Sequence, residues 1–144
     1  MENDFSNKIN VVYFSPEKVI KAIKKLKTNG SGGDDKLSNI LFLNVAPENA
    51  FPLSCIFNLS ITASCVPITW ISGIVIPIFK KCSTSDASNY KPITLTCISC
   101  KIIETIIKND LISHLYNNKL ISKHQHGFLR KHSTSTQLLE CVND

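Results

Sequence analysis

The sequence lacks the short motifs by which many enzyme classes are recognised. It contains no GxxxxGK[ST] phosphate loop, no HExxH metalloprotease helix, no GxSxG nucleophile turn and no GxGxxG dinucleotide fingerprint. It also contains no internal repeat. Function must therefore be inferred from the order of the predicted elements and from the placement of charged side chains.

Charge is absent from residues 49–79, a stretch long enough to raise the question of a membrane span. Three prolines interrupt this stretch: Pro52, Pro67 and Pro77. A lipid-facing helix would leave backbone groups unpaired at those positions, so we favour a buried helix over residues 53–63 and no membrane contact. Residues 65–67 are then a loop that leads, through Trp70, to a strand.

No secretory signal precedes the six cysteines, most of which lie in apolar stretches. We therefore expect reduced, buried thiols in an intracellular protein. Cys97 and Cys100 form a CxxC, but no second pair follows at the spacing of a zinc ribbon. Apolar neighbours on a predicted helix favour a core role for both side chains.

The composition indicates one globular domain with a moderate positive charge. The chain has 144 residues, of which 43% are hydrophobic and 19% charged, with a formal net charge of +5. Such a charge favours anionic partners, but it is too small to identify a nucleic-acid-binding protein.

Helix signals recur along the chain. Ser15-Pro16-Glu17 combines a hydroxyl cap, a first-turn proline and an early acid, and predicts a helix that ends at Asn29-Gly30. Residues 1–14 are expected to be an extended lead-in. Three further helices are predicted from apolar spacing and capping residues, over residues 38–45, over residues 98–116 and from Ser133 onward.

Two groups of side chains invite a metal hypothesis that we do not favour. Asp34 and Asp35 follow a glycine-rich turn, where aspartates more often form turns or cap the next helix. His124 and His126 have no cysteine or carboxylate nearby in the sequence to complete a ligand set. We therefore predict no metal site in this chain.

The chain is organised around a predicted β-hairpin, with strands at about residues 74–80 and 90–95. A polar connector rich in Ser, Thr, Asp and Asn joins the strands. This arrangement would bring Lys80, Lys81 and Lys91 together, and converging cations suit a polyphosphate or a nucleic-acid backbone. The alternative is an edge hairpin whose lysines only keep it soluble.

Four blocks, in this order and with these gaps, carry a family resemblance: VIKAIKKLKTNGSGGDD, IFNLSITASCVPITWISGIVIPIFKK, SNYKPITLTCISCKIIETII and LISKHQHGFLRKHSTSTQLL. The chain resembles the N-terminal part of the reverse transcriptase domain of LINE-type (non-LTR) retrotransposons, from about Phe14 to Leu139. The resemblance implies a mostly helical α+β fingers fragment with one β-hairpin, spanning residues 15–144 of a truncated domain without its palm.

The resemblance also implies site residues. Lys80, Lys81 and Lys91 would lie near the triphosphate of an incoming nucleotide. Seven residues would lie near the template: Ser31, Gly33, Asp35, Gln125, Gly127, Phe128 and Arg130. The family usually has arginine at the position of Lys91, so a bidentate contact with phosphate oxygens would be weakened here. It also has arginine where this chain has Leu129.

The family's catalytic aspartates lie beyond the last predicted helix, so no catalytic residue is assigned here. We expect a fragment of an RNA-directed DNA polymerase that contributes nucleotide and template contacts but is inactive alone. Its partners would be an RNA template, a DNA primer and, in the complete enzyme, a nucleoside triphosphate with Mg²⁺. The alternatives are a basic module that binds RNA or DNA nonspecifically, and a relic without function.

Overall fold

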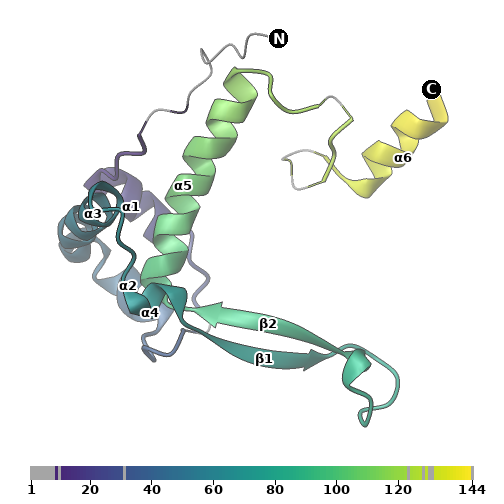
Figure 1. The fold of residues 1–144 in the computed structure, drawn as a ribbon, viewed down its shortest axis with the longest axis horizontal. Coiled ribbons are helices and arrows are strands. Elements are labelled where there is room, and N and C mark those ends of the chain that lie inside the picture. Colours follow the sequence, from purple (N-terminus) through teal and green to yellow (C-terminus); the bar gives the residue numbers. More distant parts are fainter. Residues whose placement is uncertain are drawn as a thin grey trace. The chain divides into compact units, whose positions relative to one another are not determined.

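The structure is a computed structural model that describes residue 9 and residues 11–30, 32–122, 124–127, 129 and 132–143. The chain divides into two compact units, Val11–Lys108 and the remaining residues, and each is described by itself. Figure 1 labels the α-helices and the two strands, and the short 3-10 helix η2 lies in the loop between the strands. Their bounds are α1 Pro16–Ile23, α2 Asn39–Asn44, α3 Ala46–Thr62, α4 Ile68–Ile71, β1 Gly73–Phe79, η2 Ala87–Asn89, β2 Tyr90–Thr96, α5 Ile98–Asn117 and α6 Thr134–Asn143.

The predicted α+β class with one antiparallel hairpin is confirmed, and so is the long helix α5. Residues 11–14 form neither helix nor strand, while residues 1–8 and 10 lie outside the described part of the chain. The division of the chain at residue 15 therefore stays a prediction. No helix among the described residues is long and apolar enough to cross a membrane.

Helix α1 begins where the sequence predicts and ends earlier. The Ser15 hydroxyl accepts a hydrogen bond from the Lys18 N–H at 3.3 Å, and the same hydroxyl lowers the pKa of Glu17 by hydrogen bonding to its carboxylate. The predicted end at Asn29-Gly30 is wrong, because α1 stops at Ile23. Beyond Ile23 the backbone tightens, with the Lys25 N–H donating to the Ala22 carbonyl at 3.1 Å and the Leu26 N–H to the Ile23 carbonyl at 2.9 Å. The Lys27 carbonyl accepts from the Asn39 side chain at 2.7 Å.

Helix α3 is longer than predicted. It begins at Ala46 rather than near residue 53, because Pro47 occupies its first turn, where a missing N–H costs nothing. Pro52 lies inside the helix, where it removes one backbone hydrogen bond without ending the element. The prediction treated Pro52 as a helix boundary. In the structure the packing of α3 against α1 outweighs the cost of the proline, and the helix continues through it.

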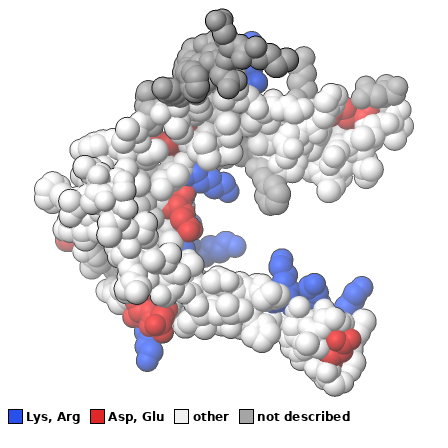
Figure 2. Space-filling view, viewed as in Figure 1, with Lys and Arg blue, Asp and Glu red and all other residues white. Residues whose placement is uncertain are grey.

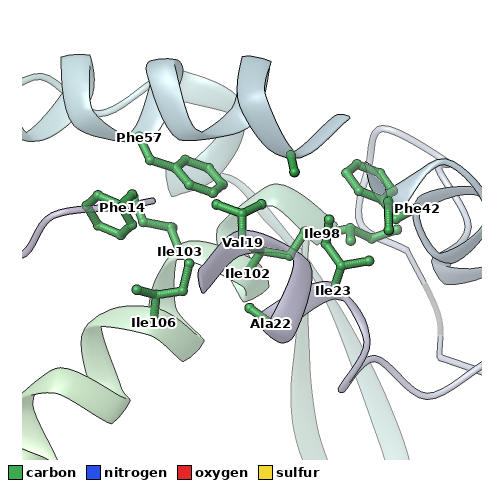
Figure 3. Packing of buried hydrophobic residues seen from close by; sticks show 12 residues of the cluster. Phe14, Val19, Ala22, Ile23, Phe42, Phe57, Ile98, Ile102, Ile103 and Ile106 are labelled. Carbon is green, nitrogen blue, oxygen red and sulfur yellow. The ribbon is translucent and has the colours of Figure 1, made fainter. Parts of the chain in front are cut away.

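The core of the Val11–Lys108 unit lies between α1, α3 and α5, whose apolar side chains point toward one another in Figure 3. Its fully buried members include Phe14, Val19, Ile23, Phe57, Ile98 and Ile102. The Phe57 ring lies edge-on between two others, with centroid distances of 5.6 Å to Phe14 and 5.5 Å to Trp70. Edge-to-face contacts of this kind add to the stabilisation from burial alone.

The prediction of mostly buried cysteines is wrong. Cys97 and Cys100 are buried in the core region, as predicted for the CxxC. Burial, with a hydrogen bond to Glu104, raises the pKa of Cys100 to about 12, so its thiol is unreactive at neutral pH. The other four are exposed, because they lie on solvent-facing positions of helices and loops: Cys55, Cys65, Cys82 and Cys141.

Asn58 clamps the segment that precedes α1. Its side chain accepts from the Phe14 N–H at 3.1 Å and donates to the Phe14 carbonyl at 2.9 Å, and Ser54 donates to the same carbonyl at 2.7 Å. The amide thus pairs with Phe14 as a neighbouring strand would. This pairing satisfies the backbone of a residue whose ring is fully buried.

Asn58→Ala is expected to lower the free energy of unfolding by about 2 kcal/mol, because the partly buried Phe14 N–H loses its partner and the Phe14 carbonyl keeps only the Ser54 hydroxyl. Urea denaturation followed by tryptophan fluorescence measures this change, since the single tryptophan lies in the same core. Thr62→Ala is the control on the same helix, because its hydroxyl is exposed and donates to the Asn58 carbonyl, not to Phe14. Equal losses for the two variants would contradict the clamp.

Candidate nucleotide and nucleic-acid interface

The hairpin is a two-stranded antiparallel arm, shown in Figure 1, in which Ile78 pairs with Lys91 and Pro77 with Pro92. The Lys80 N–H donates to the Asn89 carbonyl at 2.8 Å and extends the ladder by one pair. Side chains alternate between the two faces of a strand. One face therefore carries lysines and aliphatic side chains, and the other carries Val75, Phe79, Tyr90 and the two prolines.

Lys80 and Lys91 are diagonal neighbours on the same face, because Lys80 pairs with Asn89 and Lys91 lies two residues further along β2. Such diagonal positions are about 7–8 Å apart. Lys81 follows directly, outside the ladder, and all three side chains are exposed. Figure 2 shows basic side chains gathered along one edge of the hairpin near its loop end. The structure thus brings the three predicted lysines together.

No carboxylate among the described residues forms an ion pair with these lysines. The hairpin has a single acid, Asp86, which accepts from the Ser88 N–H at 2.9 Å. This bond lowers the pKa of Asp86 and keeps it ionised as a cap for η2. Two cations at this separation in water repel by roughly 0.5 kcal/mol. The fold tolerates that cost, and an anion bridging the lysines would remove it.

Pro77 and Pro92 limit the pairing of a further strand with either edge of the hairpin. Because the Lys80–Asn89 pair is hydrogen-bonded, the alternation of the ladder places Pro77 opposite Pro92 at a non-hydrogen-bonded pair. Each proline nitrogen then points to the outer edge of its strand, where it offers no donor to a further strand. Every residue of β1 is exposed. The hairpin is therefore kept as an arm with two accessible faces.

The glycine-rich loop packs at the base of this arm. Gly33 is buried, and a Cβ added there would lie 2.6 Å from the Cys97 nitrogen and 2.7 Å from the Thr96 carbonyl carbon. Asp35 forms a turn, accepting from the Leu37 N–H at 3.3 Å. Five residues of strand, roughly 17 Å, separate Thr96 from Lys91. The structure therefore brings Gly33 to the hairpin base but not to the lysines.

Sequence reasoning missed Asn39, which holds this loop in place. Its side chain is buried and donates to the Lys27 carbonyl, and a Cβ at Gly30 would clash with it at 2.1 Å. Its Oδ1 is buried and has no hydrogen-bond partner among the residues that the structure describes. The available signal was its position directly after Ser38, the cap of α2. Ser31, another predicted template residue, lies outside the described residues.

The third group of predicted residues belongs to the unit of residues 109–144. The Gln125 side chain donates to the Gly127 carbonyl at 3.0 Å, which closes a short turn. Phe128 and Arg130 lie outside the described residues. Sequence reasoning missed the partners of His126, whose buried ring contacts Thr136, Glu140 and His132. These partners lie 6 to 14 residues downstream, and no local pattern connects them to it.

The described residues contain no group of three His, Cys, Asp or Glu side chains that could hold a metal ion. The two aspartates of the glycine-rich loop fit a turn rather than a cation site, since one carboxylate oxygen of Asp35 accepts a hydrogen bond from the Leu37 N–H. The described residues therefore do not supply a set of ligands for the Mg²⁺ that is expected in a complete polymerase. No catalytic step is assigned to this chain.

Comparison with known proteins identifies relatives over almost the whole chain. No protein-family model matches it. The chain is 32% identical over 145 aligned positions to the RNA-directed DNA polymerase from mobile element jockey of Drosophila melanogaster, covering 99% of this chain and 16% of that protein. The probable RNA-directed DNA polymerases from transposon BS and transposon X-element of the same species are 27% and 25% identical, over 85% and 90% of this chain. Only 14% of each of these two is covered, so the chain spans about one seventh of the relatives' length.

Proposed function

Because this chain is a relative of the RNA-directed DNA polymerases of LINE-type mobile elements and corresponds to a segment of them, we propose that it supplies nucleotide and template contacts to such an enzyme. The RNA template and DNA primer are its partners within the cell. In the complete enzyme a nucleoside triphosphate and Mg²⁺ join them, and the metal is held by residues other than those described.

The observation that carries the proposal is the diagonal pair Lys80 and Lys91 on one accessible face of the hairpin. Lys81 adds a third cation at the same end. Lysine ammonium groups act on phosphate as point charges, and their effect grows where charge develops on phosphoryl oxygens. A nonspecific basic module would use the same lysines, so the experiment must separate the two functions.

We assign different tasks to the three groups of residues. Lys80, Lys81 and Lys91 contact the triphosphate. Gly33 acts through backbone packing at the hairpin base, while Ser31 and Asp35 belong to the loop that meets the template. Gln125, Gly127, Phe128 and Arg130 form a second template contact. Burial supports the packing role of Gly33, since the lysines are exposed and Gly33 is not. The template contacts rest on the family resemblance.

Lys91→Ala is expected to weaken binding of a deoxynucleoside triphosphate about tenfold, because one charged contact to phosphate is lost. Lys91→Arg should match or exceed the parent, since a guanidinium presents a planar fork to phosphate oxygens. Amide chemical-shift titration of the chain with dTTP measures both affinities. Binding of a labelled RNA–DNA hybrid, followed by anisotropy across a salt series, should lose about one unit of salt slope in Lys91→Ala.

Lys25→Ala provides the control for general loss of charge, because Lys25 is an exposed lysine outside the hairpin. Equal losses of dTTP affinity in the Lys25 and Lys91 variants would leave only nonspecific electrostatics. The nucleotide contact would then be rejected in favour of a basic module. Absence of any binding at low salt would favour a relic without function.

A further inference from the structure

A groove lies on the face of the hairpin opposite to Lys80 and Lys91. Its lining comes from the two strands and from the connector between them: Pro77, Thr84, Ser85, Ala87, Tyr90 and Pro92. The groove is open to solvent and has a volume of about 610 Å³, within the range of about 300–1,000 Å³ that is usual for ligand sites. Because side chains alternate between the faces of a strand, the lysines do not line it.

Tyr90 is the aromatic residue of this groove, and its ring is held at two points. Its hydroxyl donates to the Thr84 carbonyl at 2.9 Å. Its ring packs against Phe79, the residue directly opposite on β1, with centroids 5.4 Å apart. The connector is fixed as well, because the Asn89 side chain donates to the Ser83 carbonyl at 2.8 Å. A ring that is already held in place loses little entropy when a ligand stacks on it.

The lining favours a flat and largely apolar ligand. Two proline rings and the Tyr90 ring offer apolar surface, and none of the six lining residues is charged. Hydroxyl groups are present on Thr84 and Ser85, and the Ser85 hydroxyl lies 2.6 Å from that of Ser83. A nucleobase has matching properties, since its face stacks on aromatic side chains while its edge forms hydrogen bonds.

The positive charge of the arm favours a nucleic-acid strand as the source of this base. Residues 79–80 and residues 90–91 each place an aromatic side chain on one face and a lysine on the other. The two strands lie only about 5 Å apart, so a flexible nucleic-acid strand along the edge of the arm can contact both faces. Lysines that follow a phosphate backbone, beside rings on which bases stack, are typical of single-strand binding. Asp86, the single acid of the hairpin, lies in the connector and disfavours phosphate there.

We propose that this groove binds one base of a single-stranded nucleic acid, whose phosphates lie along the lysines at the edge of the arm. The ligand class rests on the proposed function, whereas the groove does not. Tyr90 supplies the stacking surface, and the prolines supply apolar contact. A proline-rich peptide is the alternative occupant, because aromatic-lined grooves also bind such segments. The lysines favour the nucleic acid, since a peptide of that kind has no phosphates for them to contact.

Two single strands that differ only in their bases test this assignment on the whole 144-residue chain. One is an oligothymidylate, and the other is an oligonucleotide of the same length in which every residue is abasic. Both carry the same phosphate charge, so the lysines contribute equally to the binding of each. By fluorescence anisotropy the parent is expected to bind the oligothymidylate about tenfold more tightly, because a base gains a stacking partner. Equal affinity for the two strands would overturn the assignment.

Variants of Tyr90 locate the source of this preference. Tyr90→Leu should bring the ratio of the two affinities close to one, whereas Tyr90→Phe should retain most of it because the ring remains. Tyr13→Leu is the matched control, since Tyr13 is an exposed tyrosine outside the hairpin, and it should leave the ratio unchanged. An unchanged ratio in Tyr90→Leu would also reject the groove. Because Tyr90 belongs to β2, the parent provides a readout without mutation: the Ala87 methyl resonance should shift with the oligothymidylate and not with the abasic strand.

Inorganic triphosphate, which has no base, separates the groove from the nucleotide contact. If it shifts the amide resonances of Lys80 and Lys91 while the preference for bases is absent, the nucleotide contact stands and the groove fails. If the preference holds without such a shift, the groove stands and the triphosphate contact fails. A proline-rich peptide that shifts the Ala87 methyl resonance where the oligothymidylate does not would replace the nucleic-acid assignment with a peptide site.

Discussion

Replacing Phe57 with alanine is expected to lower the free energy of unfolding by about 4 kcal/mol. The ring is fully buried and contacts Phe14 on one side and Trp70 on the other. Its removal leaves a cavity between α1 and α3 and breaks both aromatic contacts. Natural domains are stable by only about 5–15 kcal/mol, so this loss is a large part of the total.

The measurement is urea denaturation followed by fluorescence of the single tryptophan, whose ring touches Phe57. Phe51→Ala supplies a matched control, because Phe51 lies on the same helix but is 67% exposed. Its loss should be within about 0.5 kcal/mol. Similar losses at both positions would mean that α3 presents a different face to the core.

Local chemistry explains what the sequence could predict about the fold. Ser15 and Pro16 mark a helix start because a side-chain oxygen and a fixed φ act within a few residues. The strands of the hairpin are likewise predicted by β-rich runs on either side of a polar connector. In contrast, the conformation of the segment after α1 involves Asn39, whose side-chain amide donates to the Lys27 carbonyl across 12 residues. A contact at that distance leaves no periodic signal.

In the candidate site, too, some features could be predicted from local sequence and others depend on tertiary packing. Convergence of the lysines follows from the existence of a hairpin, which the sequence indicates. Their placement on one face requires the register, since a slip of one residue would move Lys91 to the other face. The burial of Gly33 and the contacts of His126 depend on packing between distant segments. For this reason Gly33 was predicted only as a template residue, through family resemblance, and its tight packing was missed.

Gly33→Ala is expected to destabilise the chain by about 3 kcal/mol, which corresponds to a fall in melting temperature on the order of 10 °C. The added methyl group would lie 2.6–2.8 Å from backbone atoms of Thr96 and Cys97. Backbone at the junction of β2 and α5 cannot move aside as a flexible side chain can. The steric clash can therefore be removed only if the glycine-rich loop moves away from the base of the hairpin.

Thermal unfolding by circular dichroism measures this loss, and Gly127→Ala is the matched control. Among the described residues, a Cβ at Gly127 would meet only the Gln125 side chain, at 3.5 Å, so little change in stability is expected. The Gly33→Ala variant also separates packing from ligand contact at Gly33. A stable Gly33→Ala protein with reduced affinity for an RNA–DNA hybrid would contradict the packing role and make Gly33 part of the template contact. Loss of stability, with the hybrid affinity of the remaining folded protein unchanged, would assign Gly33 to the scaffold that supports the lysine arm.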